Sequence, residues 1–507
     1  MADIALPAPR SDSFASLRAA MPRLLPMLTG AALLLGLACR LYAGIDAPLW
    51  LDETFSAEIA SQPDFPHFLR WALTEMSGPV YYGSLFLWEK IAGNSDLALR
   101  LPSLALSIAA PLVVLRWGHR DRDVRMLWAA ILALSVVGFD SATEARPYAL
   151  LLLLACLQTI AYVRMIDAPT IRRALIWTSL SALMVLTHYY AALICAVQGV
   201  AYLAICRGRA VRTWPALGPL VPMALWASYH LPFVLGFATS DANWYRLLQP
   251  DALWLIPLLL TGMSWPGLLL LAGMAAQVGM DARAALVGKA RWPYTPGETA
   301  AAASGLIALL ALLAAGFVVP TFTPRYVLPY IPAIFLGMAL WVRRTLPLTP
   351  LVAPVLLCAL LGSAGSQLAG YIRHPEADYR YIYNFAAPSR WIAAQQPLRL
   401  VFLWDGPTAL IPDPDRHMAA VGSFFLRRDG IDIPVVTPPW PRDGDPNLTL
   451  LQAAGQESGT AILWAYDVNI PGTRGRAHPW RIPAIDPRWD CRDFGRGPVA
   501  LVACIRR

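Results

Sequence analysis

Apolar runs of about 20 residues recur along the first 361 positions of this chain. A run of this length crosses a bilayer as an α-helix, because a spanning segment must satisfy its backbone hydrogen bonds internally. The composition agrees, since 57% of the 507 residues are hydrophobic, only 15% are charged, and the mean hydropathy is +0.48. The sequence therefore predicts an α-helical polytopic membrane protein.

The arginines are distributed unevenly among the loops between these runs. We count about eleven spans, at residues 24–43, 97–117, 126–139, 147–165, 174–188, 191–206, 215–237, 253–280, 300–319, 326–341 and 346–361. Every second loop carries an arginine cluster, for example at 116–125, 164–173 and 207–212, on the same side as the N-terminal arginines. Because cytoplasmic loops carry the Lys/Arg excess, we expect a cytoplasmic N-terminus and an extracytoplasmic C-terminus. This placement accounts for the net charge of +8 without a nucleic-acid partner.

One further apolar run, Val80–Ala92, differs from the spans. It is about a dozen residues long, which is too short to cross a bilayer comfortably, and it contains Glu89 and Lys90. If it were a span, every later loop would change sides and the arginine pattern would be lost. The sequence therefore predicts a juxtamembrane helix that lies on the membrane surface.

Two adjacent carboxylates, Asp52 and Glu53, stand in the stretch Trp50–Thr54 directly after the first span. Carboxylates at a membrane boundary are costly unless they are solvated or paired. Two interpretations stay open for them. They are either acidic residues that stabilise the start of a short juxtamembrane helix, or a general base held just outside the membrane.

The loops opposite the arginine clusters carry polar residues of both charge signs. Beside Asp52 and Glu53, this set comprises Asp140, Glu144, Arg146, Tyr148, His188, Tyr189, Tyr190, the loop 241–246, Arg325 and Tyr326. Ionisable groups that converge at one membrane face are typical of a functional site. Structural alternatives also stay open: Arg146 and Arg325 as snorkelling anchors, and His188 as a packed core histidine.

Residues 364–507 differ in character, because Pro, Asp, Arg and Gly increase and no spanning run remains. Apolar runs at 399–403, 434–437, 460–465 and 499–505 predict strands, and the segments 418–427 and 448–456 predict helices. We expect a small α/β domain outside the membrane, where Cys491 and Cys504 can form a disulfide. The predicted organisation is a cytoplasmic tail at 1–23, a transmembrane domain at 24–363 and an extracytoplasmic domain at 364–507.

Several short motifs follow one another in a distinctive order. They are WLDE at 50–53, GPVYYGSLFLWEKIAGNSDLALRLPS at 78–103, EARPYAL at 144–150, LTHYY at 186–190, TPRYVLPYIP at 323–332 and HPEADYR at 374–380. In this order they resemble the GT-C glycosyltransferases related to protein O-mannosyltransferases and aminoarabinose transferases, in the bacterial branch with a dolichyl-phosphate-mannose-transferase-like domain. The resemblance covers roughly residues 20–390. It departs at Ser77-Gly78-Pro79, where that family often has His-Pro-Pro.

The resemblance implies a GT-C fold with juxtamembrane helices, and transfer of a sugar from a polyprenyl-phosphate donor to an acceptor hydroxyl. Asp52 matches the family's catalytic aspartate, and Glu53 is its neighbour, so these two are the expected catalytic residues. The residues expected to bind the donor phosphate are Arg146, Arg325, Tyr148, Tyr326 and His188. Single displacement with Asp52 as the base would invert the configuration of the sugar carbon.

No cofactor is certain from the motifs, although Asp52, Glu144 and His188 would together suit a divalent cation. The expected partners are the lipid-linked sugar, an envelope glycan, lipid or protein as acceptor, and membrane lipids. The expected location is the bacterial inner membrane. Two other functions stay open: a flippase or transporter of lipid-linked glycans, and a non-catalytic membrane scaffold. A transporter would place ionisable groups at mid-membrane on broken helices.

Overall fold

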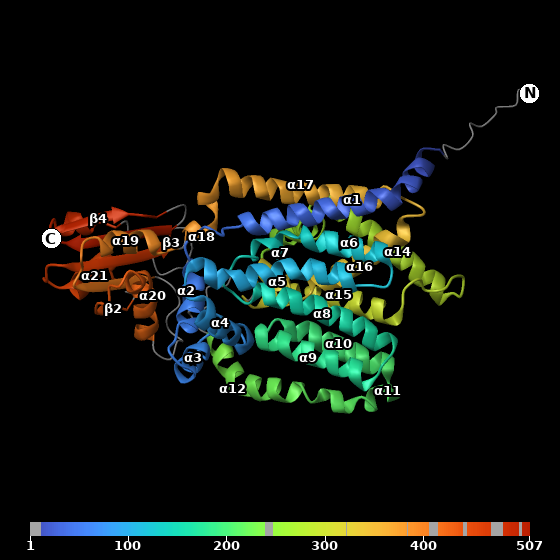
Figure 1. Ribbon diagram of the computed structural model, residues 1–507, viewed down its shortest axis with the longest axis horizontal. Coiled ribbons are helices and arrows are strands. Elements are labelled where there is room, and N and C mark those ends of the chain that lie inside the picture. Colours follow the sequence, from blue (N-terminus) through green and yellow to red (C-terminus); the bar gives the residue numbers. More distant parts are fainter. Residues whose placement is uncertain are drawn as a thin grey trace, which may run out of the picture.

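The computed structural model describes residues 12–238, 247–320, 322–382, 384–404, 414–439, 444–467, 480–495 and 499–507. A bundle of helices makes up most of the molecule, and a five-stranded sheet with its own helices lies at one end of it (Figure 1). The N-terminal end of α1 (Asp12–Tyr42) lies at the other end of the bundle (Figure 1). The predicted loop 241–246 lies outside the described residues.

The apolar runs of the sequence form nearly all helices of the bundle. These are α1, α5 (Asp96–Trp117), α6 (Arg122–Ala133), α7 (Val136–Asp140), α8 (Tyr148–Asp167), α9 (Ile171–Thr187), α10 (Ala191–Cys206), α12 (Leu220–Ala238), α13 (Leu255–Thr261), α14 (Trp265–Leu286), α15 (Pro296–Val318), α16 (Ile331–Thr345) and α17 (Val352–Arg373). The short helix α11 (Gly208–Val211) lies in the arginine-rich loop after α10. Within the described ranges, six helices are long and apolar enough to cross a membrane, namely α1, α5, α8, α14, α15 and α17. The prediction of a multi-pass membrane protein is confirmed.

Three of the predicted span boundaries differ from the structure. The run 126–139 is divided between α6 and α7, and the run 253–280 is divided between α13 and α14. The second division occurs at Gly262, which ends α13 in the left-handed conformation with φ of 69°. Helix α17 continues to Arg373, so the helical bundle extends past the boundary that we predicted at residue 363.

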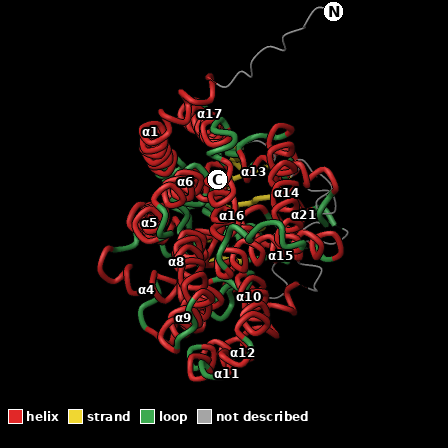
Figure 2. Tube along the Cα trace, turned by 90° about the vertical axis from the view of Figure 1, so that its right-hand side faces the viewer, coloured by secondary structure: helices red, strands yellow, loops and turns green. Residues whose placement is uncertain are grey.

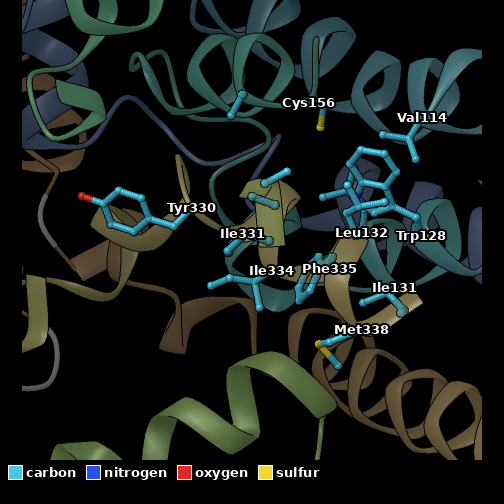
Figure 3. Close-up of a cluster of buried hydrophobic side chains, with 14 of the residues drawn as sticks. Val114, Trp128, Ile131, Leu132, Cys156, Tyr330, Ile331, Ile334, Phe335 and Met338 are labelled. Atoms are coloured by element: carbon cyan, nitrogen blue, oxygen red, sulfur yellow. The ribbon is translucent and has the colours of Figure 1, made fainter. Parts of the chain in front are cut away.

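Helix α16 forms the centre of the bundle and packs against α6, α8 and α15 (Figure 2). It is apolar on all sides, which suits a helix that is surrounded by other helices. Phe335 and Met338 of α16 belong to the same buried apolar cluster as Leu132 and Trp128 of α6 (Figure 3). This rigid centre matters for function, because the turn that carries Arg325 directly precedes α16.

Three short helices, α2 (Leu51–Ala60), α3 (Phe65–Ala72) and α4 (Pro79–Ala92), lie between the bundle and the sheet (Figure 1). Helix α4 has 14 residues, buries Tyr82 and Leu85, and leaves Leu87 and Ile91 exposed. A short helix with apolar side chains on its outer surface agrees with the predicted position at the membrane surface.

Gly78, which stands just before α4, explains part of the departure from the family motif. A Cβ atom at this position would lie 1.9 Å from the carbonyl oxygen of Leu186 in α9. Only glycine permits two backbones to approach so closely. The Ser77-Gly78-Pro79 sequence therefore accompanies a close contact between the start of α4 and the outer end of α9.

The sheet contains β1 (Arg399–Trp404), β2 (Val435–Val436), β3 (Thr460–Asp467), β4 (Trp489–Asp493) and β5 (Val499–Arg506), in the order β2-β1-β3-β5-β4. Strand β1 runs parallel to β2 and β3, whereas β5 runs antiparallel to β3 and β4. The accompanying helices are α18 (Tyr379–Ile382), α19 (Ala386–Ala393), α20 (Pro414–Arg428), α21 (Pro446–Ala454) and α22 (Ile482–Ile485). The four predicted strands and both predicted helices are confirmed.

Strand β4 was not predicted, because its sequence Trp-Asp-Cys-Arg-Asp is mostly polar and lacks an apolar run. It pairs with β5 at the edge of the sheet, and Cys491 lies directly opposite Cys504. These two cysteines form a disulfide, as the sequence predicted.

The loops that carry the arginine clusters meet at the end of the bundle remote from the sheet. Arg343 forms an ion pair of 3.0 Å with Asp121, and Arg164 donates a hydrogen bond of 2.7 Å to the carbonyl oxygen of Trp117. The two ends of the molecule are therefore chemically different. The arginine-rich loops lie at one end, and the candidate site residues lie at the other.

Candidate active site

The first turn of α2 holds both carboxylates that were expected to be catalytic, and Glu53 is the buried one. Its Oε1 accepts hydrogen bonds from Nε of Arg100 at 2.9 Å and from the backbone N–H of Ala145 at 2.8 Å. Its Oε2 accepts from Nη2 of Arg100 at 2.5 Å and from the backbone N–H of Trp50 at 3.2 Å. These four bonds occupy all of the roughly four lone-pair sites of the carboxylate, so none remains for a substrate. The geometry of Glu53 is that of an anchor, which differs from the catalytic role that we expected.

Asp52 is placed differently, because its side chain keeps 27% exposure. Its Oδ2 lies 3.5 Å from Nη2 of Arg325, which is the one side-chain partner recorded for Asp52 within the described ranges. The backbone N–H at the start of α2 is bonded by Glu53 rather than by Asp52. The helix-capping interpretation therefore applies to Glu53, and the carboxylate of Asp52 is open to a substrate.

Arg325 lies in the 3-10 turn Pro324–Val327, before the central helix α16. Its guanidinium stands over the rings of Tyr148 and Trp50, at 5.3 Å and 5.8 Å from their centroids. A guanidinium carries five N–H donors. In the described part of the chain its one recorded hydrogen bond is the 3.5 Å contact with Asp52, so most donors remain for an anionic ligand.

Arg146 is more fully engaged than Arg325. Its Nη1 contacts the carbonyl oxygen of Asp52 at 3.2 Å, Oγ of Ser56 at 3.4 Å and Oε1 of Glu75 at 3.2 Å. These contacts tie the loop before α8 to α2 and to the loop that follows α3. Arg146 therefore fixes the backbone at Asp52, and its guanidinium adds positive charge to the site.

The aromatic residues expected at the site lie together. The ring of His188 lies 5.8 Å from Tyr148 and 5.2 Å from Tyr326, and Tyr326 stacks on Tyr190 at 4.2 Å. His188 is buried, and the guanidinium groups of Arg146 and Arg325 lie nearby. The Nδ1 atom of His188 is buried and has no hydrogen-bond partner among the described residues, which leaves it available to a ligand.

Glu144 is a second buried carboxylate at the edge of the site. Its Oε1 accepts a hydrogen bond from the hydroxyl of Tyr379, and its Oε2 has no partner in the described ranges. Burial raises the pKa of Glu144 to about 7, although Arg325 and Arg380 act in the opposite direction. Tyr379 also packs edge-on against Trp50 at 5.0 Å, so the segment after α17 closes one side of the site.

The residues proposed for a divalent cation do not form a metal-binding group. Among the described residues, no three side chains of His, Cys, Asp or Glu lie close enough together to hold a metal ion. Asp52, Glu144 and His188 each have other neighbours, namely Arg325, Tyr379 and two tyrosine rings. We therefore assign no step of the chemistry to a metal.

Sequence reasoning brought most of these positions to one face but missed several of their partners. The missed residues are Glu75, Arg100, Tyr379 and Arg380. The signal for three of them was present, because Tyr379 and Arg380 belong to the HPEADYR motif and Arg100 belongs to the motif at 78–103. Glu75 lies outside the motifs. Only the fold brings Glu75 to Arg146 and Arg100 to Glu53.

Fold and site together define a multi-pass helical membrane protein with a cluster of acidic, basic and aromatic side chains at one end of the bundle. No protein-family model matches the sequence, and no curated protein matches it. Solved structures do match.

The crystal structure of ArnT from Cupriavidus metallidurans in the apo state matches 96% of this chain and 98% of that chain, with 13% identity and a TM-score of 0.53. The structure of the same protein bound to undecaprenyl phosphate matches with the same coverage, 14% identity and a TM-score of 0.48. The first match extends over nearly the whole chain, including the C-terminal sheet. It shows that this chain shares the fold of that ArnT structure.

Proposed function

We propose that this protein is an integral membrane glycosyltransferase that moves a sugar from a polyprenyl-phosphate donor to an extracytoplasmic acceptor hydroxyl on a glycan, lipid or protein. The Asp52–Arg325 pair carries the proposal: a partly exposed carboxylate lies 3.5 Å from a guanidinium with unused donors. Displacement of a phosphate by a hydroxyl needs a proton acceptor and a group that stabilises the departing anion. The GT-C fold and the order of the motifs support the same reaction.

Asp52 acts as the base in the proposed reaction. The acceptor hydroxyl gives its proton to Asp52 while its oxygen forms a bond to the anomeric carbon of the sugar. The bond between that carbon and the phosphate oxygen breaks, and polyprenyl phosphate leaves with the electron pair. Attack from the face opposite the phosphate inverts the anomeric configuration. A positioned base of this kind typically accelerates a reaction by roughly 10²–10⁴-fold.

Arg325 binds the phosphate in this proposal, with Tyr148, Tyr326 and His188 beside it. Its contact with Asp52 is long, at 3.5 Å, so a phosphate that approaches at normal hydrogen-bond distance competes well for the guanidinium. Donor binding then draws Arg325 away from Asp52 and leaves the carboxylate ready to accept a proton. Arg146 and Glu53 keep the turn that carries Asp52 in place.

We further propose that the protein lies in the bacterial inner membrane with its N-terminus in the cytoplasm. The active site and the C-terminal domain are then extracytoplasmic. Two observations support this orientation. The arginine-rich loops gather at the end remote from the sheet, and the sheet contains the Cys491–Cys504 disulfide, which suits an oxidising compartment.

A transfer assay tests the proposed function and separates it from the two alternatives. Purified protein in lipid nanodiscs would be given a panel of radiolabelled polyprenyl-phosphate sugars together with envelope extracts as acceptors. We expect label in an acceptor fraction and release of polyprenyl phosphate. Movement of intact donor across proteoliposomes without transfer would support a flippase. Neither transfer nor movement with any donor of the panel would support a scaffold.

A further inference from the structure

A long apolar groove runs between α10 and α15 on the side of the bundle. Its volume is about 900 Å³. Helix α10 contributes Val197, Val200 and Ile205 to its wall, and α15 contributes Ala303 and Ile307. The two helices lie side by side near the periphery of the bundle (Figure 2). The groove is therefore open to the lipid that surrounds the protein.

The length of the groove matches one leaflet of a bilayer. Along α10 it extends from Ala196 to Ile205, which corresponds to about 14 Å at 1.5 Å per residue. Half of the hydrocarbon core is about 15 Å thick. Trp292, whose indole N–H donates to Thr299 at 2.7 Å, lines the groove at the arginine-rich end. Tryptophan is enriched at the level of lipid head groups, so this end is the mouth of the groove.

Three cations are close in sequence to residues at the mouth of the groove. Arg207 and Arg209 directly follow the end of α10, and Arg291 precedes the lining tryptophan. All three are exposed, and the described part of the chain offers no ion pair to any of them. Arg343, at the same end of the bundle, is by contrast paired with Asp121 at 3.0 Å. The charges at the mouth are thus available to an external anion.

We propose that this groove is a binding site for an anionic phospholipid in the leaflet remote from the active site. One acyl chain fills the apolar groove, and the phosphate contacts Arg207, Arg209 and Arg291. Basic pockets between transmembrane helices on the cytoplasmic side are known binding sites for anionic head groups. The sugar donor is a poor match, because its phosphate belongs at Arg325, at the opposite end of the bundle.

Native mass spectrometry with dioleoyl phosphatidylglycerol tests the site in the full-length protein after removal of endogenous lipid. We expect one phosphatidylglycerol molecule to be retained in preference to dioleoyl phosphatidylcholine. Val200→Trp should abolish this preference, because it fills the groove. Leu203→Trp is the matched control: both positions are on α10, with exposures of 69% for Val200 and 61% for Leu203, but only Val200 lines the groove. Equal retention by both variants would overturn the proposal.

The charges are tested separately by the double variant Arg209→Gln/Arg291→Gln. We expect it to bind phosphatidylglycerol about 30-fold more weakly, or about 2 kcal/mol at 1.4 kcal/mol per tenfold change. Arg172→Gln, in another arginine cluster at the same end, should change little. Unchanged affinity in the double variant, or preferential occupancy of the groove by undecaprenyl phosphate, would refute an anionic phospholipid site. Each of these results is independent of whether sugar transfer is detected.

Discussion

Glu53→Gln tests the anchor that holds the active-site turn. The change keeps the shape of the side chain but replaces one carboxylate oxygen with an NH₂ group. That group then faces Arg100 and a backbone N–H, so two of the four hydrogen bonds are lost. Arg100 is fully buried and is left without its counter-charge. Breaking a buried ion pair from one side costs about 3–5 kcal/mol. We expect a loss of that size in the free energy of unfolding.

Chemical denaturation in detergent micelles, followed by tryptophan fluorescence, measures this loss. Glu58→Gln is the matched control, because Glu58 also lies in α2 and pairs with Arg427 at 2.6 Å. The side chains of Arg427 and Glu58 are 33% and 15% exposed, so this partly solvated pair should contribute less than the fully buried pair of Glu53 and Arg100. Suppose that Glu53→Gln were as stable as Glu58→Gln and yet inactive. Glu53 would then belong to the chemistry, and the anchor interpretation would be refuted.

Three further predictions concern protonation, donor binding and orientation. The pKa of Glu144 is raised from 4.5 to about 7, so the folded protein holds a proton that the unfolded chain has lost, and stability falls as pH rises through this window. Glu144→Gln should remove this pH-dependent decrease of about 3 kcal/mol in the free energy of unfolding. The Tm of the variant should then depend less on pH between 5 and 8 than that of the wild type, and an equal dependence would contradict the prediction. Arg325→Ala should weaken donor binding by about 1.5–3 kcal/mol in an equilibrium binding assay, and wild-type affinity would argue against its role at the phosphate. In a background without Cys358, a membrane-impermeant thiol reagent should label Glu457→Cys but not Arg172→Cys in intact cells; the reverse pattern would overturn the orientation.

The architecture was largely predictable because it depends on signals that are local in the sequence. The apolar runs that form α5, α8 and α15 have a length set by the bilayer. Strands β1, β3 and β5 are short apolar runs, and turn residues mark their ends. The breaks at residues 134–135 and at Gly262 were missed because a helix can be divided without any loss of hydrophobicity.

The site was predictable only in part, because some of its contacts join residues that are far apart in the sequence. The positions of Asp52, Arg325 and His188 at one membrane face follow from the arrangement of the loops. The division of roles between Asp52 and Glu53 does not, because it depends on Arg100, which is 47 residues away in the chain from Glu53. Neighbouring residues on a helix face different directions. One of the two carboxylates therefore points into the protein and the other remains accessible.

The most direct test of the proposed mechanism is a pair of measurements on Asp52→Asn: donor affinity and the rate of sugar transfer. Asparagine keeps the size of the side chain, and the phosphate-binding residues are unchanged, but the amide cannot take the proton of the acceptor hydroxyl. We predict donor affinity close to that of the wild type and a turnover lower by about 10²–10⁴-fold. Transfer by Asp52→Asn at near the wild-type rate would contradict the assignment of Asp52 as the base.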